Sequence, residues 1–179
     1  MRKFTKNTFL FKEHVTLFKG SNNYDVYDPQ TKEIILHCRE KNLTPLYSLL
    51  RLFITELKSI TPFEIEISGL DGKKIIKVKK GLSLVFPKIE VFDENDKLIG
   101  LFKQKLFPVG NNFEMFDEKG NLVSKLKGSL IGWNFKFVKD ENTIATVTKK
   151  WAGIGKELFT SADNYILDIN DDVEKASPL

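Results

Sequence analysis

Residues 89–150 repeat one pattern three times, and this repeat constrains the fold more than any other feature of the chain. The three copies are residues 89–105, 113–128 and 133–150. Each copy alternates apolar and polar residues, passes through a short turn rich in Asp, Asn, Gly and Lys, and alternates again towards closely spaced lysines. Alternation with period two is typical of a half-buried β-strand, so each copy predicts a β-hairpin.

Two earlier segments follow the same pattern and predict two further hairpins. Residues 24–40 alternate around a turn at residues 28–31, where Pro29 has the fixed φ that suits the second position of a turn. Residues 63–80 alternate around Asp71-Gly72, a dipeptide strongly associated with tight hairpins. The turn centres recur about every two dozen residues, which indicates one repeated supersecondary unit.

The hairpin turns also predict which residues face each other across the strands. Closing the chain on Asp71-Gly72 places Glu66 opposite Lys77 and Glu64 opposite Lys79. Closing it on Lys119-Gly120 places Glu114 opposite Lys125. With an opening strand within residues 8–19 and a closing strand at 165–169, five hairpins give twelve strands. Twelve antiparallel strands lose their exposed edges by closing, so we expect an all-β closed barrel.

One segment, Thr44 to Ser59, predicts an amphipathic helix instead of a strand. Thr44 can cap it, Pro45 suits its first turn, and its apolar residues recur at spacings of three and four. We expect this helix to pack against the sheet or to plug one end of it. An interfacial membrane helix is the alternative, although only Arg51 and Lys58 lie on its polar face.

Size and composition indicate one soluble globular domain covering residues 1–179. The chain has 179 residues, 41% of them hydrophobic and 29% charged, with a net charge of +4. That charge is too small for a nucleic-acid-binding protein, and we expect no nucleic acid partner. No stretch is long and apolar enough for a spanning helix. The N-terminal segment is interrupted by Lys6, Lys12 and Glu13, so we expect no secretory signal and a cytoplasmic protein, with peripheral membrane association left open.

The residues that commonly carry catalysis or metal binding do not form a recognisable motif. The lone Cys38 excludes an intramolecular disulfide and is expected to be buried. His14 and His37 lie in strand-like alternations without a nucleophile motif, and the carboxylates Glu64 and Glu66 are expected to pair with lysines across the hairpin. We therefore expect no enzyme, no cofactor and no metal site.

The order of several short segments resembles a known family. These segments are FKEHV, YDVYD, TPFEIEI, the three central hairpins, KKW and FTSADNY. In that order the chain is similar, from Phe9 to Leu179, to the phospholipid scramblase-like and LURP-one-related proteins of the Tubby C-terminal-like superfamily. The resemblance implies a twelve-stranded closed barrel around a central apolar C-terminal helix.

The central helix of the family has no counterpart in the sequence. The chain ends at Ser177-Pro178-Leu179, which suits only the start of a helix. Three ways of filling the bore of the barrel stay open. The favoured one is a helix beyond Leu179; the others are residues 44–59 folded inward and an apolar ligand.

The resemblance brings little of the family's chemistry to these residues. It implies a calcium site around SADNY, but Ser161 stands where an acidic residue is expected. The remaining aspartates Asp163, Asp168, Asp171 and Asp172 lack EF-hand spacing, so we expect no calcium there. The cysteines that carry lipid anchors in animal scramblases are replaced by residues 82–87, LSLVFP, which makes lipid scrambling the third choice of function.

Lysines two residues apart mark the second strands of the hairpins and form the candidate site. Residues two apart share one face of a strand, and equivalent strands lie about 10 Å apart around a barrel of hairpins. We expect these lysines to form a belt that binds anionic lipid: Lys77, Lys79, Lys103, Lys105, Lys125, Lys127, Lys149 and Lys150. The alternative is that they solubilise the wall and neutralise its glutamates.

Two classes of function follow. The first is a non-catalytic barrel that binds anionic phospholipid or phosphoinositide at a membrane surface, as Tubby-like domains do. The second is a soluble interaction or regulatory barrel whose partner is an unknown protein.

Overall fold

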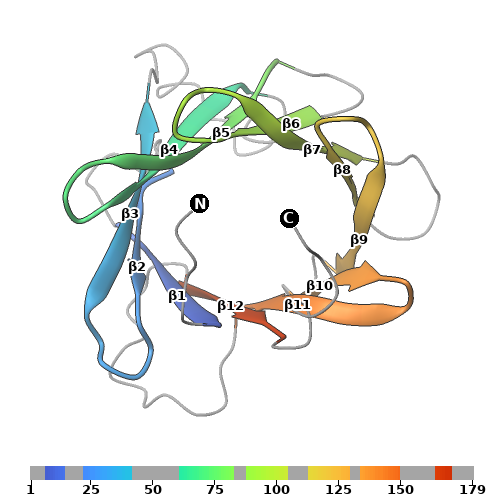
Figure 1. Cartoon of the computed structure of the whole chain (residues 1–179). Helices are drawn as coiled ribbons and strands as arrows, with labels where there is room; N and C mark the ends of the chain where they lie inside the picture. The colour runs from blue at the N-terminus through green and yellow to red at the C-terminus, as the bar shows by residue number, and fades with distance from the viewer. Residues whose placement is uncertain are drawn as a thin grey trace.

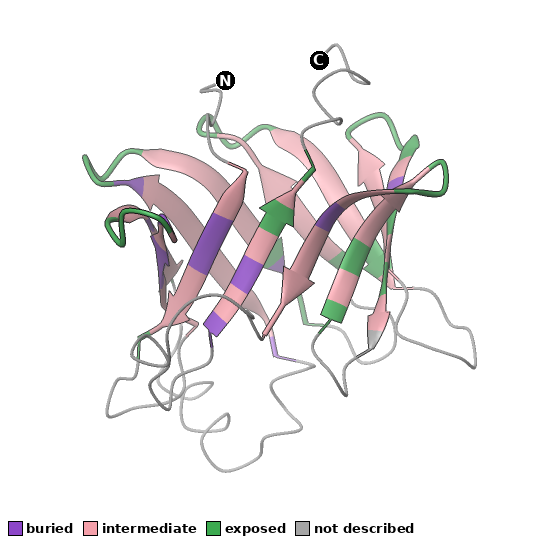
Figure 2. Cartoon of the chain, turned by 90° about the horizontal axis from the view of Figure 1, so that it is seen from below, coloured by how far each residue is buried: buried purple, intermediate pink, exposed green. Residues whose placement is uncertain are grey.

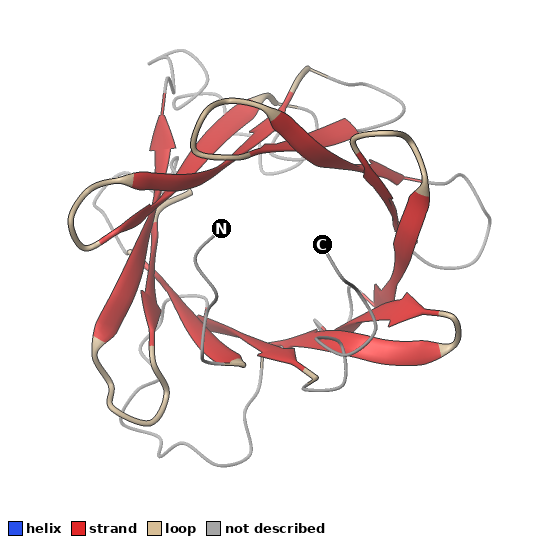
Figure 3. Cartoon of the chain, viewed as in Figure 1, coloured by secondary structure: helices blue, strands red, loops and turns tan. Residues whose placement is uncertain are grey.

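A computed structural model describes residues 7–14, 22–41, 61–82, 88–104, 113–129, 134–149 and 164–170, and the regular elements among them are all strands. The strands close into one antiparallel barrel in which β1 pairs with β12 and every other strand pairs with its sequence neighbours (Figures 1 and 3). They are β1 (Thr8–Glu13), β2 (Tyr24–Tyr27), β3 (Ile34–Lys41), β4 (Phe63–Gly69), β5 (Lys74–Lys80), β6 (Lys88–Phe92), β7 (Leu98–Gln104), β8 (Phe113–Asp117), β9 (Leu122–Ser129), β10 (Asn134–Lys139), β11 (Asn142–Thr148) and β12 (Asn164–Ile169).

The prediction of a twelve-stranded closed barrel is therefore confirmed, and so are the predicted cross-strand pairs. Glu66 faces Lys77 and Glu64 faces Lys79 between β4 and β5. Glu114 faces Lys125 between β8 and β9. Several other predictions lie outside the described residues: the helix at 44–59, the segments 83–87 and 151–160, Ser161 with Asp163, and the chain beyond residue 170.

The hairpin turns lie at one rim of the barrel, where Figure 2 shows their exposed residues. In two of these turns a glycine has a left-handed backbone, Gly72 with φ of 76° and Gly120 with φ of 85°. Asp93 and Asp117 begin two turns, and each side chain accepts hydrogen bonds from two backbone N–H groups further along its turn. Such local bonds favour a turn over a continued strand.

The side chains that alternate inward form the interior. Phe9, Val26, Leu36 and Cys38 are buried together on the β1–β3 side of the barrel. Inward side chains from the ten successive strands β1 to β10 line a cavity of about 400 Å³. Its lining is Phe11, Tyr24, Cys38, Phe63, Ile65, Ile67, Val78, Ile89, Phe102, Phe113, Leu126 and Phe137.

One inward side chain of β9 carries a polar group that has no partner in the part of the chain that the structure describes. Ser124 is 2% exposed, and its hydroxyl has no hydrogen-bond partner among the described residues. We expect Ser124→Ala to raise the free energy of unfolding by about 1 kcal/mol, because burying an unsatisfied hydroxyl costs stability. Urea denaturation measures this change. Ser68→Ala, in the half-buried Ser68 of β4, should change stability by less than about 0.5 kcal/mol. A destabilised Ser124→Ala protein would mean that the hydroxyl has a partner.

Candidate functional site

The outer face of the barrel carries many of the charged residues, because each strand turns alternate side chains away from the bore. On β4 and β5, Glu64, Glu66, Lys77 and Lys79 alternate with the residues that line the cavity. Because cross-strand partners share a face, the residues paired with these four on the neighbouring strands also lie on the outer face.

The two predicted belt lysines on β5 lie next to several acidic groups. The Lys77 ammonium is 2.5 Å from Asp96 Oδ1, and the hydrogen bond to Asp96 raises the pKa of Lys77. Asp96 also accepts a bond of 2.7 Å from Lys74, and these two lysines lower the pKa of Asp96 to about 2. Lys79 faces Glu64 on one side and Glu90 on the other. On β5 the lysines therefore serve mainly to balance acidic neighbours.

The lysines on β7, β9 and β10 have fewer acidic neighbours, and we call four of them the basic patch. Lys127 directly faces Lys136, a pairing of like charges that costs stability. Lys125 lies two residues from Lys127 on the same face and faces Glu114 on β8. Across β8, Glu114 also faces Lys103. The basic patch thus consists of Lys103, Lys125, Lys127 and Lys136, all exposed.

The basic patch differs from the predicted belt in its membership. Lys136 belongs to it but lies on the first strand of its hairpin, whereas the sequence pattern followed lysines on second strands. Lys149 directly follows β11 and, by alternation, lies on the same inward face as Ala145 and Val147. Its ammonium is 5.9 Å from the ring centroid of Tyr165. Lys105 and Lys150 lie outside the described residues.

An apolar row adjoins the basic patch on the same outer wall. Leu101, Phe116 and Leu122 are cross-strand partners on β7, β8 and β9 and form this outer apolar row. Leu122 is 49% exposed. The Lys103 ammonium lies 4.9 Å from the Phe116 ring centroid, so a cation sits directly at the border of the row. Apolar side chains bordered by lysines are typical of surfaces that dock on membranes or proteins.

A second polar cluster surrounds Asp25 on the outer face of β1–β3, and sequence reasoning missed it. The Asp25 carboxylate accepts hydrogen bonds from Arg39 at 2.6 Å, from His37 at 2.8 Å and from His14. Burial acts to raise the pKa of Asp25, but hydrogen bonds from His37, Arg39 and His14 outweigh it and lower that pKa to about 2. Arg39 also donates to the carbonyl oxygens of Tyr24 and Cys38. The cluster thus ties β1, β2 and β3 together as a structural network.

Cys38 is buried, as predicted, and lines the bore. Burial raises the pKa of its thiol to about 11, so the thiol stays protonated at neutral pH. Because the thiolate is the reactive form of cysteine, this side chain is unsuited to nucleophilic catalysis.

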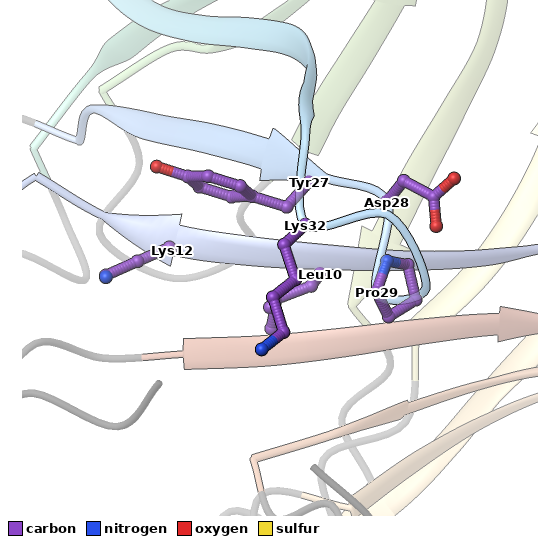
Figure 4. Close-up of a pocket in the computed structure, with 6 residues that line it drawn as sticks. All are labelled: Leu10, Lys12, Tyr27, Asp28, Pro29 and Lys32. Carbon is purple, nitrogen blue, oxygen red and sulfur yellow. The ribbon is translucent and has the colours of Figure 1, made fainter. Parts of the chain in front are cut away.

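A small pocket lies on the outer face beside the first hairpin turn (Figure 4). It has a volume of about 40 Å³ and is lined by Leu10, Lys12, Tyr27, Asp28, Pro29 and Lys32. Small-molecule sites usually enclose about 300–1,000 Å³, so we assign it no ligand.

Within the residues described, no group of three or more His, Cys, Asp or Glu side chains could hold a metal ion. Across the same residues, we find no helix with the length and apolar character needed to cross a membrane.

Comparison with known proteins gives one match, the family model named Scramblase, which covers residues 6–176. This chain belongs to the scramblase family. The scramblase match agrees with the resemblance found in the segments between Phe9 and Leu179, and with a lipid-related role for the barrel. No curated protein and no solved structure matches the chain.

Proposed function

We propose that the barrel is a non-catalytic module that binds anionic lipid, such as a phosphoinositide, at the cytoplasmic surface of a membrane. The binding surface is the outer wall of β7–β10, which combines the basic patch with the outer apolar row. Membership of the scramblase family supports a lipid-related role.

The observation that carries this proposal is the direct pairing of Lys127 with Lys136. Like charges on facing strands repel, and both side chains are exposed. A phosphate group placed between them would turn this repulsion into two favourable interactions. Lys125 on the same face would add to the attraction, since each lysine near an anionic surface contributes about 1 kcal/mol.

The outer apolar row gives the surface a second means of contact. Leu101, Phe116 and Leu122 can enter the interfacial region of a membrane while the neighbouring lysines stay at head-group level. This arrangement favours a membrane surface over a free phosphate in solution, because a free phosphate ion has no apolar surface to bury against these side chains.

Replacing three patch lysines tests the proposal. We expect Lys125→Ala, Lys127→Ala and Lys136→Ala together to weaken binding to anionic vesicles about 100-fold, because three contributions of about 1 kcal/mol are lost. The control is a triple variant with the same change in charge, Lys41→Ala, Lys74→Ala and Lys79→Ala. Two of these lysines form ion pairs, Lys41 with Glu66 at 3.2 Å and Lys74 with Asp96 at 2.7 Å.

Vesicle sedimentation with phosphatidylserine and phosphoinositide measures the binding of both variants. Equal weakening by the two triple variants would mean that net charge alone drives binding. It would exclude the basic patch as a specific binding surface. Absence of binding by the unmodified protein would favour the interaction barrel with a protein partner.

A further inference from the structure

One carboxylate lies inside the basic patch. Glu114 of β8 faces Lys103 of β7 on one side and Lys125 of β9 on the other. Facing side chains on paired strands have Cβ atoms about 4.5–5.5 Å apart, so opposite charges at such positions attract each other. The Glu114 side chain is half-buried, whereas both lysines are exposed. Lys103 and Lys125 therefore share one acidic neighbour.

The other two lysines of the basic patch have different neighbours. Lys127 faces Lys136, and on its other side Lys136 faces the uncharged Thr146 of β11. Among the described residues, neither of these two lysines has an acidic cross-strand partner. The basic patch thus has two halves, of which only the half with Lys103 and Lys125 contains a carboxylate.

Glu114 is also the single acidic member of a row of cross-strand partners in the described strands. Across β6, β7, β8 and β9 the row consists of Lys88, Lys103, Glu114 and Lys125. A lipid phosphate that contacts Lys103 or Lys125 must approach the Glu114 carboxylate. That carboxylate repels the phosphate and attracts the same ammonium groups. Glu114 is therefore placed to compete with the lipid for these two lysines.

We propose that Glu114 determines how much negative charge a membrane must carry before the barrel binds to it. This inference rests on the proposed function of the basic patch. The four patch lysines carry four positive charges and Glu114 one negative charge, so the local charge is +3 with Glu114 and +4 without it. Attraction to an anionic surface grows with each such charge. Glu114 thus keeps the affinity for weakly charged membranes low and makes the patch selective for membranes rich in anionic lipid.

Glu114→Gln tests this role, because it removes the charge and keeps the shape of the side chain. The probe is a vesicle of phosphatidylcholine with about 10% phosphatidylserine, which has a weak negative surface potential. We expect Glu114→Gln to bind this vesicle about tenfold more tightly than the unmodified protein, since two lysines lose their competing carboxylate. Glu114→Ala is measured alongside it and should show a similar gain. Thermal melting shows whether each variant is folded.

The matched control is Glu66→Gln, which makes the same change in charge on another part of the outer wall. Glu66 of β4 lies 3.2 Å from the Lys41 ammonium and faces Lys77. Because β4 is three strands from β7, Glu66 lies about 14 Å along the wall from the nearest patch lysine, which is more than a Debye length of about 8–10 Å. We therefore expect Glu66→Gln to change vesicle binding by less than about twofold.

A second comparison separates competition for the lysines from simple repulsion of the membrane by Glu114. The change Glu114→Gln is repeated in a protein that also carries Lys103→Ala and Lys125→Ala. If Glu114 acts through these lysines, the gain in affinity should fall from about tenfold to less than about threefold, because interacting residues are not additive. Repulsion of the membrane alone would leave the gain unchanged.

The outcomes distinguish this inference from the proposed function. If neither the unmodified protein nor Glu114→Gln binds vesicles rich in phosphatidylserine, the proposed function is wrong and the role of Glu114 falls with it. If the unmodified protein binds such vesicles, four results overturn the role of Glu114 alone. These are no gain in either Glu114 variant, an equal gain in Glu66→Gln, an undiminished gain without the two lysines, and unfolding of both Glu114 variants, which would make Glu114 a structural residue.

Discussion

Gly128→Ala should destabilise the barrel by about 3 kcal/mol and lower its melting temperature by about 10 °C, as expected for overpacking in a protein of this size. Gly128 of β9 faces Phe135 of β10. A Cβ atom at Gly128 would lie 2.4 Å from the Asn134 carbonyl oxygen and 2.6 Å from the Phe135 ring. Because the nearest atom belongs to the backbone, β9 and β10 would have to move apart to relieve the contact.

Gly81→Ala is the matched control for this effect. A Cβ atom at Gly81 would meet no other atom within 4 Å. We expect its melting temperature to change by no more than about 2 °C, as for most exposed substitutions. Thermal denaturation of both variants measures the difference. Equal melting temperatures would contradict the close approach of β9 and β10.

Asp25→Asn should reduce the free energy of unfolding by about 2 kcal/mol at neutral pH. This figure corresponds to the difference between the ordinary carboxyl pKa of 3.8 and the value of about 2 in the folded protein. The substitution keeps the shape of the side chain, but Arg39, His37 and His14 lose the charge that they surround. Denaturant unfolding of the two proteins at several pH values measures the effect.

The same pKa fixes the sign of the pH dependence. A lowered carboxyl pKa contributes stability that is complete above the unfolded value of 3.8 and is lost as the pH falls towards about 2. The difference in free energy of unfolding between the unmodified protein and Asp25→Asn should therefore stay constant around neutral pH. It should disappear between about pH 4 and pH 2. Asp168→Asn, in an exposed side chain of β12, is the control and should change stability by less than about 0.5 kcal/mol. If this difference in free energy of unfolding persisted at low pH, it would contradict a stabilising role for the ionised Asp25 carboxylate.

The sequence was sufficient to predict the strand number and part of the register. Gly72 and Gly120 have the left-handed backbone that their turns require, and glycine is the residue that signals such a position. The pairs Glu66–Lys77 and Glu114–Lys125 could therefore be predicted from the chain alone. The alternation of lysines and apolar residues likewise placed Lys77, Lys79, Lys125 and Lys127 on one face.

The Asp25 cluster could not be predicted in the same way. In the first hairpin the left-handed residue is Lys32, with φ of 61°, and lysine has no preference for that conformation. A bulge next to Tyr27 shifts the register further. The sequence predicted the turn at residues 28–31 but not the register that follows from the bulge, and the pairing of Asp25 with His37 depends on that register.

The prediction of the lysine belt was incomplete for a similar reason. Alternation shows which face a lysine occupies, but it does not show which acidic residue lies on the next strand. Asp96 reaches Lys74 and Lys77 from the turn between β6 and β7, which requires the paired strands to be in place. Lys136 joins the basic patch only because β10 pairs with β9 in the observed register.

The most direct test of a barrel that binds anionic membranes is vesicle flotation of the unmodified protein at two salt concentrations. Neutral phosphatidylcholine vesicles and vesicles that also contain phosphatidylserine and phosphoinositide are compared at about 0.05 M and about 0.5 M salt, because screening weakens exposed charge interactions. We expect the protein to float with the anionic vesicles at low salt, and we expect this flotation to decrease strongly at high salt. Equal flotation with neutral and anionic vesicles, or none with either, would contradict it.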